Sequence, residues 1–146
     1  MIYLLDLNYT LAEKVSINFQ NFTYDVSKDK YRNDLVQKLK NERVFLITAR
    51  TENYKDETIE KIKKETDLQI ERFYFKPLNK KFQKVEFFKS DIVKQLFLEG
   101  FNPEDFFGIE SNVNTRNEYL KLNVKSLDYK NFMKEELCQT QQTKLF

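Results

Sequence analysis

The chain begins with Met1-Ile-Tyr-Leu-Leu-Asp-Leu-Asn-Tyr-Thr-Leu11, and this stretch decides the fold. Ile2 to Leu5 is a continuous apolar run that ends at Asp6. A short run of this kind is typical of a strand that is buried on both faces of a parallel sheet. We therefore expect a central strand here, with Asp6 at its carboxyl end.

Later apolar runs predict the neighbouring strands. Val44 to Ile47 ends at Thr48, and Phe106 to Ile109 ends at Glu110. The remaining expected strands are Ile70 to Phe75 and Val124 to Leu127. Between the first two strands, the polar segment Ala12 to Ser27 favours a loop or a small hairpin above the first strand.

Helices are predicted where apolar residues recur three or four positions apart. These residues are Tyr31, Leu35 and Leu39, then Ile59 and Ile62, then Phe88, Ile92 and Leu96, with a closing helix expected at Asn131 to Leu137. Strands that alternate with helices favour right-handed βαβ units. We predict an α/β fold with three layers, a Rossmann-like parallel sheet with helices on both faces, over residues 1–138. A polar tail follows at 139–146.

Composition limits the class of protein. The 146 residues are 40% hydrophobic, which is enough for one domain with one core. The 25 basic and 23 acidic residues are too balanced to indicate nucleic acid or a membrane as partner. No apolar stretch approaches the roughly 18 residues of a membrane span. The lone Cys138 excludes a disulfide scaffold and indicates a reducing cytoplasm. Without histidine, proton transfer falls to other groups.

Polar residues follow each of the three main strands. In an open parallel sheet the ligand site lies beyond the carboxyl ends of the strands, where the strand order reverses. The residues at these ends are Asp6, Asn8 and Thr10, then Thr48 and Arg50, then Glu110, Ser111 and Asn112. They are expected to converge on one crevice. The alternatives are purely structural roles, in which Thr48 caps a following helix and Glu110 is a solvated residue at a strand end.

The first two of these stretches resemble motifs of the haloacid-dehalogenase-like superfamily. Tyr3-Leu-Leu-Asp6-Leu-Asn8-Tyr-Thr10-Leu11 is similar to its first motif, an apolar strand followed by Asp-x-Asp-x-Thr. Asn8 departs from it, since family phosphatases carry a second Asp there. Phe45-Leu-Ile-Thr48-Ala-Arg50 resembles the second motif, whose Thr or Ser binds the phosphoryl group.

The third and fourth motifs have counterparts further along the chain. Val85-Glu-Phe-Phe-Lys89-Ser-Asp-Ile resembles the stretch with the motif lysine, and Lys89 fits that place better than Lys84. Phe106-Phe-Gly-Ile-Glu110-Ser111-Asn112 resembles the strand closed by an acidic pair, of which only Glu110 is acidic here. The resemblance covers Tyr3 to about Leu127. The compact members of the superfamily have a small or absent cap domain, and the segment Ala12 to Ser27 is too short for a full helical cap.

The resemblance implies a magnesium-dependent phosphohydrolase. Asp6 would attack phosphorus and form an aspartyl-phosphate, while Thr48 and Lys89 hold the phosphoryl oxygens. Mg²⁺ would be held by Asp6, the backbone carbonyl of Asn8 and Glu110, with Asn112 as a neutral helper. The implied substrate-binding residues are Thr10, Arg50 and Lys84. The substrate would be a nucleotide, a polynucleotide end or another small phosphate ester.

Two departures leave a second interpretation open. An Asn at position 8 cannot donate a proton to a leaving alcohol, so hydrolysis is expected to be slow. Ser111 weakens the metal site further. The alternative is a catalytically inactive relative that binds a phosphorylated ligand, nucleic acid or a protein partner.

A stretch rich in lysine and aromatic residues allows nucleic-acid binding as a further partner interaction. Its residues are Phe73, Tyr74, Phe75, Lys76, Lys80, Lys81, Phe82, Lys84, Phe87, Phe88 and Lys89. The alternative is a solvated loop with rings that face the core, since Glu71 and Glu86 dilute its charge. The substrate's identity and the oligomeric state stay open at this point.

Overall fold

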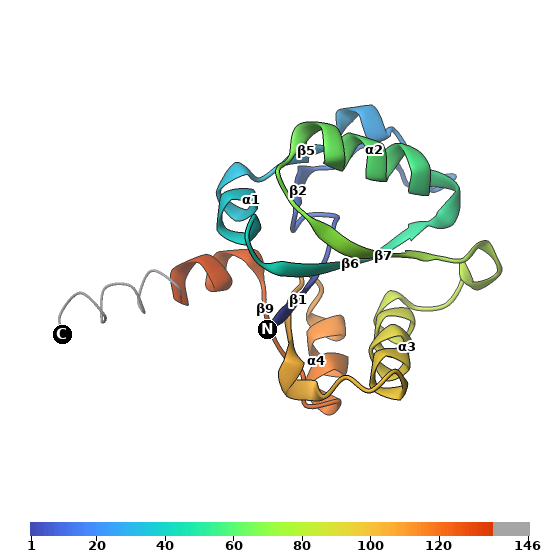
Figure 1. The fold of residues 1–146 in the computed structure, drawn as a ribbon. Coiled ribbons are helices and arrows are strands. Elements are labelled where there is room, and N and C mark those ends of the chain that lie inside the picture. The colour runs from blue at the N-terminus through green and yellow to red at the C-terminus, as the bar shows by residue number, and fades with distance from the viewer. Residues whose placement is uncertain (136–146) are drawn as a thin grey trace.

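The computed structural model of the chain describes residues 1–135, which form three layers (Figure 1). The central layer is a parallel five-stranded sheet in the order β7-β6-β1-β8-β9. Its strands are β1 (Ile2–Leu5), β6 (Arg43–Thr51), β7 (Ile70–Lys76), β8 (Phe106–Ile109) and β9 (Lys125–Leu127). The predicted Rossmann-like α/β fold class is confirmed.

Helices cover both faces of the sheet (Figure 1). On one face lie α1 (Asn33–Leu39) and α2 (Lys55–Glu65), and on the other α3 (Val85–Leu98) and α4 (Val113–Lys121). Residues 129–135 are also helical and contribute Phe132 to the core on the α1 side. Among residues 1–135, no helix is both long enough and apolar enough to cross a membrane.

The central strand is apolar throughout because it is covered twice. Leu5 packs into one core with Leu35 of α1 and Leu46 of β6. Leu4 points the other way, into a second core that contains Phe88 and Leu96 of α3. Successive side chains of a strand face opposite sides of a sheet, so both faces of β1 must be apolar.

Several boundaries differ from the predicted ones. β6 continues past Thr48 to Thr51, because β7 pairs beside it as far as the partners Thr51 and Lys76. Tyr31 was expected in a helix, but it lies in β5 (Lys30–Tyr31) opposite Ala12. α4 was not predicted, since it buries only Thr115 and Tyr119 and so carries little apolar pattern. The closing helix is described from 129 to 135; its predicted end, Cys138 and the tail 139–146 lie outside the described residues.

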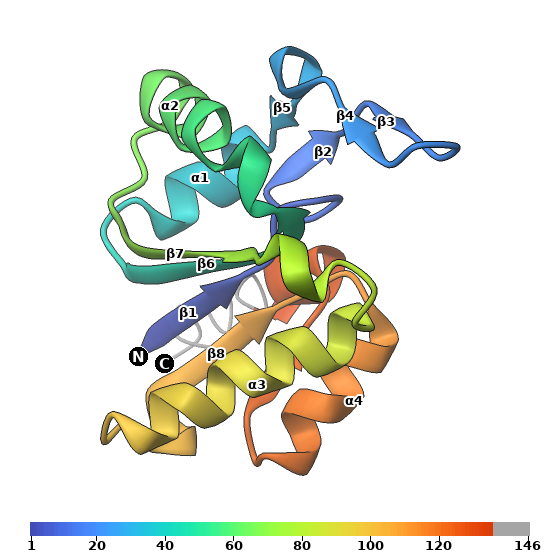
Figure 2. The same cartoon turned by 90° about the vertical axis from the view of Figure 1, so that its right-hand side faces the viewer.

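The segment after β1 forms the small hairpin that the sequence allowed. It contains β2 (Ala12–Lys14), which pairs with β5, and β3 (Ile17–Asn18), which pairs with β4 (Thr23–Tyr24). Figure 2 shows the β3–β4 hairpin jutting out beyond the end towards which the β1 and β8 arrows point. The insert therefore stands beside the carboxyl edge of the sheet, without forming a separate helical domain.

Candidate functional site

The strand order places a crevice at the carboxyl end of β1. β1 lies between β6 and β8. After β1 the chain adds β6 and β7 on one side of it and then β8 and β9 on the other, so the strand order reverses at β1. Leu5 is in register with Leu46 of β6 and with Ile109 of β8. Asp6, Thr48 and Glu110 follow these three positions by one or two residues and therefore lie at one edge, where ligands of open α/β sheets bind.

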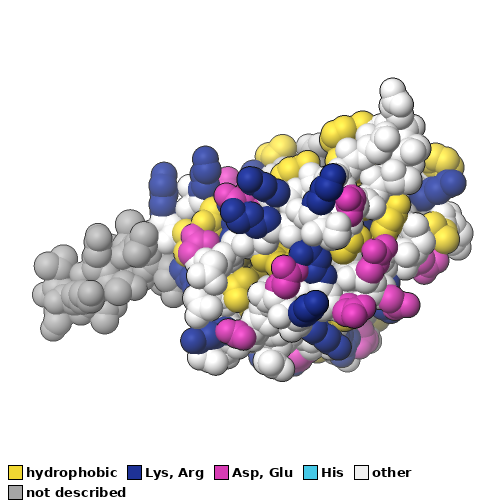
Figure 3. Space-filling model, turned by 90° about the horizontal axis from the view of Figure 1, so that it is seen from above, with side chains coloured by type: hydrophobic (Ala, Val, Ile, Leu, Met, Phe, Trp, Pro, Cys, Tyr) yellow, Lys and Arg dark blue, Asp and Glu magenta, His cyan; other side chains and the backbone are white. Residues whose placement is uncertain are grey.

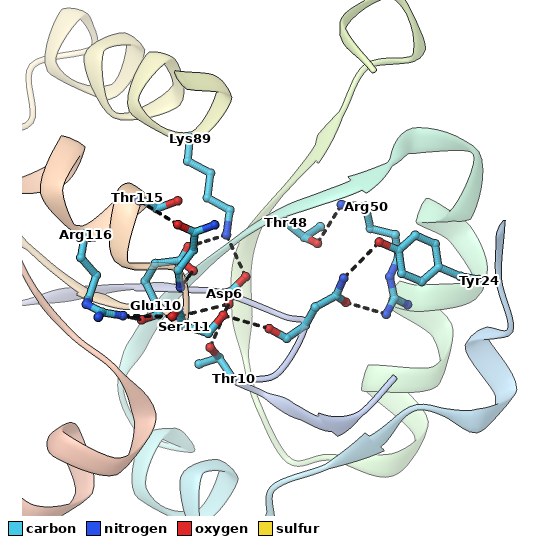
Figure 4. Close-up of polar contacts among 12 residues, drawn as sticks. Asp6, Thr10, Tyr24, Thr48, Arg50, Lys89, Glu110, Ser111, Thr115 and Arg116 are labelled. Carbon is cyan, nitrogen blue, oxygen red and sulfur yellow. Dashed lines mark hydrogen bonds and ion pairs between the residues drawn. The ribbon is translucent and has the colours of Figure 1, made fainter. Parts of the chain in front are cut away.

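Asp6 is the centre of a buried hydrogen-bond network (Figure 4). Its Oδ1 accepts from Lys89 Nζ at 2.7 Å, and its Oδ2 accepts from the hydroxyls of Thr10 and Ser111, each at 2.8 Å. Thr10 reaches back because the chain turns sharply after β1, with Tyr9 in the left-handed region at φ 63°. Every donor comes from a different part of the sequence.

These contacts decide the charge of Asp6. Burial, the largest single influence, favours the neutral acid, and it is opposed by the charge of the Lys89 ammonium. Together with the hydrogen bonds from Lys89, Ser111 and Thr10, this charge holds the pKa of Asp6 below its usual value. Asp6 is therefore ionised at neutral pH, as a carboxylate nucleophile must be.

Lys89 joins Asp6 to a second carboxylate. Its ammonium donates to Glu110 Oε1 at 2.5 Å, and the side chains of both residues are 2% exposed. The pKa of Glu110 is raised to about 7, mainly by burial and further by the charge of Asp6. The attraction of the Lys89 ammonium acts in the opposite direction. Burial disfavours the ammonium of Lys89, but the two carboxylates raise its pKa above the ordinary value. Lys84 is exposed at the N-cap of α3, so Lys89 is the lysine at Asp6.

Asn8 is held on the other side of the crevice by two side chains. Its Oδ1 accepts from Arg50 at 2.9 Å, and its Nδ2 donates to the Tyr24 hydroxyl at 3.2 Å. The Arg50 guanidinium in turn is fully buried, pairs with Asp29 at 2.7 Å, and lies 4.6 Å from the ring centre of Tyr24. Arg50, expected to bind substrate, is therefore a buried support for Asn8.

Thr48 lies at the same edge and is 1% exposed. Its hydroxyl accepts from the backbone N–H of Arg50 at 3.1 Å, and Figure 4 shows it on the Arg50 side of Asp6. The strand β6 continues past it, and the N-cap of α2 is Tyr54. Thr48 is thus not a helix cap, and among residues 1–135 its hydroxyl accepts a hydrogen bond without donating one.

The oxygens expected to bind Mg²⁺ divide into two groups. Oδ2 of Asp6 and the backbone carbonyl of Asn8 both face the Ser111 hydroxyl, at 2.8 and 3.3 Å. Both carboxylate oxygens of Glu110 are engaged elsewhere: Oε1 accepts from the Lys89 ammonium, and Oε2 accepts from the backbone N–H of Asn112. Asn112 Oδ1 caps α4. Among residues 1–135, no three acidic, histidine or cysteine side chains cluster as metal ligands do. The donors that remain fit a Mg²⁺ ion that keeps several waters and binds one carboxylate.

Sequence reasoning missed three residues that shape the site. Tyr24 and Asp29 hold Arg50 and, through it, Asn8, while Arg116 donates to the backbone carbonyl of Glu110 at 2.8 Å. Asp29 is 5% exposed, and its burial is made possible by its ion pair with Arg50, since acidic residues are almost never buried unless paired. No local pattern around these residues distinguishes them from ordinary polar loop and helix positions.

The stretch rich in lysine and aromatic residues does not form one surface. Phe75, Lys76, Phe88 and Lys89 are buried, whereas Phe82 is 91% exposed. On the face shown in Figure 3, Lys and Arg side chains are interspersed with Asp and Glu side chains. The structure therefore supports neither a continuous basic stripe along this stretch nor a basic patch on that face.

No family model matches the chain, and no curated protein matches it either. Its function is therefore inferred from the geometry of the site.

Proposed function

We propose that the chain is a haloacid-dehalogenase-like protein that cleaves phosphate esters slowly, with Asp6 as nucleophile. The observation that carries the proposal is the pairing of Asp6 with Lys89 at the carboxyl end of the central strand. A carboxylate held ionised at this point, beside a buried ammonium, suits attack on an anionic phosphorus centre.

The chemistry follows from the donors around Asp6. Asp6 forms a bond to phosphorus while the ester P–O bond breaks, and water then cleaves the aspartyl-phosphate to release inorganic phosphate and regenerate the carboxylate. Lys89 and the hydroxyls of Thr48 and Ser111 are the groups that can hold phosphoryl oxygens. The two Oδ atoms divide the tasks: Oδ2 lies beside the Asn8 carbonyl and is the metal-facing atom, so Oδ1 attacks phosphorus as the Lys89 ammonium passes from it to a phosphoryl oxygen.

Mg²⁺ belongs to the proposal as a weakly held cofactor. Asp6 Oδ2, the Asn8 carbonyl and the Ser111 hydroxyl would hold it, with water completing its shell. When bound, it would offset the repulsion between the Asp6 carboxylate and the phosphate.

Slow turnover follows from Asn8. The leaving alkoxide needs a proton, and the Asn8 amide cannot supply one at neutral pH. Its amide is also fixed by Arg50 and Tyr24. Esters whose leaving group departs without a proton should therefore react, and alkyl esters should react far more slowly.

The test compares an aryl phosphate with an alkyl phosphate in the presence of Mg²⁺. Aryl-ester hydrolysis should be measurable and should vanish in Asp6→Asn, but not in the control Asp56→Asn, which changes an exposed carboxylate in the first turn of α2. Asn8→Asp should raise alkyl-ester turnover by about 10²-fold, the lower end of general-acid effects, because Arg50 would favour the ionised form of the new carboxyl.

A second candidate function is binding of a phosphorylated ligand without turnover. It is favoured by the fact that both Glu110 oxygens and the Asn8 amide are already engaged within the protein. Three results together would favour this binding function over the enzymatic one. The aryl ester stays intact, Asn8→Asp does not increase turnover, and an oxyanion that mimics phosphate binds with an affinity that Asp6→Asn changes.

A further inference from the structure

A cleft of 740 Å³ opens beside the Asp6 site, at the same edge of the sheet. One wall is the β3–β4 hairpin with Phe22 and Tyr24, and the opposite wall is the loop after β7 with Phe82. Ala49 and Thr51 of β6 line it between these walls. Clefts of this volume are typical sites for small organic ligands.

Four aromatic side chains line the cleft, those of Phe22, Tyr24, Tyr54 and Phe82. Tyr24 and Tyr54 pack edge to face with their ring centres 5.3 Å apart, and the Tyr54 hydroxyl accepts from the backbone N–H of Tyr24 at 3.2 Å. Phe22 and Phe82 line the cleft yet are 70% and 91% exposed. Large exposed rings around a hollow are suited to stacking on a flat ligand.

The cleft also contains a buried positive charge. Lys76 is 4% exposed and lines the cleft, and its ammonium donates to the backbone carbonyls of Lys81 and Gln83. Burial lowers the pKa of Lys76, and the charge of Glu86 acts against this, but no acidic side chain within residues 1–135 lies at ion-pair distance from its ammonium. An ammonium has three donors, so one is left for an anion. Lys81 adds a second cation to the lining.

Tyr24 stands between the cleft and the Asp6 site. This residue lines the cleft, and its hydroxyl accepts from the Asn8 amide. Lys76 pairs with Thr51, four residues beyond the position of β6 that is level with Asp6, and it lies two strands from β1, so its backbone is about 16 Å from that of Asp6, a gap that the two side chains shorten. A ligand with a flat ring at one end and a phosphate at the other can therefore occupy both places.

From this arrangement we propose that the ligand is a nucleotide, whose base stacks between the aromatic walls of the cleft while its phosphate lies at Asp6. The inference rests on the proposed function, since it assigns the phosphate to that site. It narrows the expected phosphate esters to a nucleotide and names the residues that select its base. Lys76 and Lys81 then meet an anionic or carbonyl oxygen of the same nucleotide.

The experiment compares binding of guanosine 5′-monophosphate, whose base carries a carbonyl oxygen, and ribose 5-phosphate by calorimetry, using the Asp6→Asn variant so that neither is turned over. The nucleotide should bind at least about 5-fold more tightly, since one stacked base contributes a factor of roughly 5 to 150. Phe22→Ala and Phe82→Ala should each reduce this preference by about 5-fold or more and leave ribose 5-phosphate unaffected. Both side chains are largely exposed, so the variants should fold.

Phe19→Ala is the matched control. Phe19 is 72% exposed near the same hairpin, but it does not line the cleft, so its loss should leave the preference unchanged. Equal affinity for the two ligands, or a preference that survives both Phe22→Ala and Phe82→Ala, overturns the inference. Aryl-phosphate turnover tests the proposed function separately. Turnover that depends on Asp6 without any base preference would refute the cleft assignment alone, and a base preference without turnover would refute the hydrolase alone.

Discussion

Replacing Lys89 with Met is the strongest test of the buried ion cluster. Methionine keeps the length of the side chain and removes its charge. Asp6 would retain the hydroxyls of Thr10 and Ser111, and Glu110 would retain the backbone N–H of Asn112. Two buried carboxylates would nevertheless face each other without the cation that now joins them.

The expected loss can be worked out from this environment. Removing one partner of a buried ion pair destabilises a protein by about 3–5 kcal/mol. At about 2–4 °C per kcal/mol for a domain near this size, the midpoint of thermal unfolding should fall by about 6–20 °C. The loss should be smaller at pH 5 than at pH 8, because one of the two carboxylates can take up a proton in the folded variant and end the repulsion.

The assay is urea unfolding followed by circular dichroism at both pH values. Lys121→Met is the control, since Lys121 is 70% exposed in its ion pair with Glu118, and a surface pair contributes less than about 1 kcal/mol. Adding Glu110→Gln to Lys89→Met should recover part of the stability at pH 8, where the repulsion is greatest.

A free energy of unfolding within about 1 kcal/mol of the wild-type value, with the same dependence on pH, would refute the reasoning. It would mean that Asp6 and Glu110 do not share the buried ammonium in solution.

Three further predictions concern the same edge of the sheet and its packing. Because the pKa of Glu110 in the folded chain is about 7 and its ordinary value is 4.5, the folded state binds this proton more tightly. The free energy of unfolding should therefore fall as pH rises from 4.5 to 7, and Glu110→Gln should flatten that slope in urea titrations. Ser111→Asp should place a second carboxylate beside Asp6 Oδ2 and the Asn8 carbonyl, so this variant should bind Mg²⁺. At a Mg²⁺ concentration of 100 times the Kd, its free energy of unfolding should increase by about 2.7 kcal/mol and its thermal midpoint should rise accordingly. Ser111→Asn should show no such rise. Gly108→Ala should destabilise the fold by about 1–3 kcal/mol in chemical denaturation, since a Cβ there would lie 2.9 Å from Ser126 Cβ and 3.0 Å from the Tyr119 ring.

The strands that form the site were predictable from local pattern alone. β1 and β8 have the bounds expected from their apolar runs, and β6 and β7 begin within one residue of theirs. A strand covered on both faces needs apolar residues at successive positions, so the sequence marks it directly. The polar residues that end these strands, including Asp6 and Glu110, are then found at one edge because parallel strands share their carboxyl ends.

Lys89 was identified by its resemblance to a motif, and the structure brings it to Asp6, 83 positions away in the chain. The sequence did not indicate that the same ammonium also takes Glu110, which removes that carboxylate from the expected magnesium ligands. Nor did it indicate that Arg50 would be buried against Asp29.

The sequence by itself therefore determined the fold class, the central strand and the edge at which Asp6 lies. The tertiary structure decided which charge each carboxylate faces and which side chains remain free for a ligand. The physical reason is the distance along the chain over which each kind of interaction acts. Apolar periodicity is a local property that a strand or helix shows over a few residues. The partner of a buried charge is chosen by packing between segments far apart in the chain, as the contacts of Asp6 with Lys89 and of Arg50 with Asp29 show.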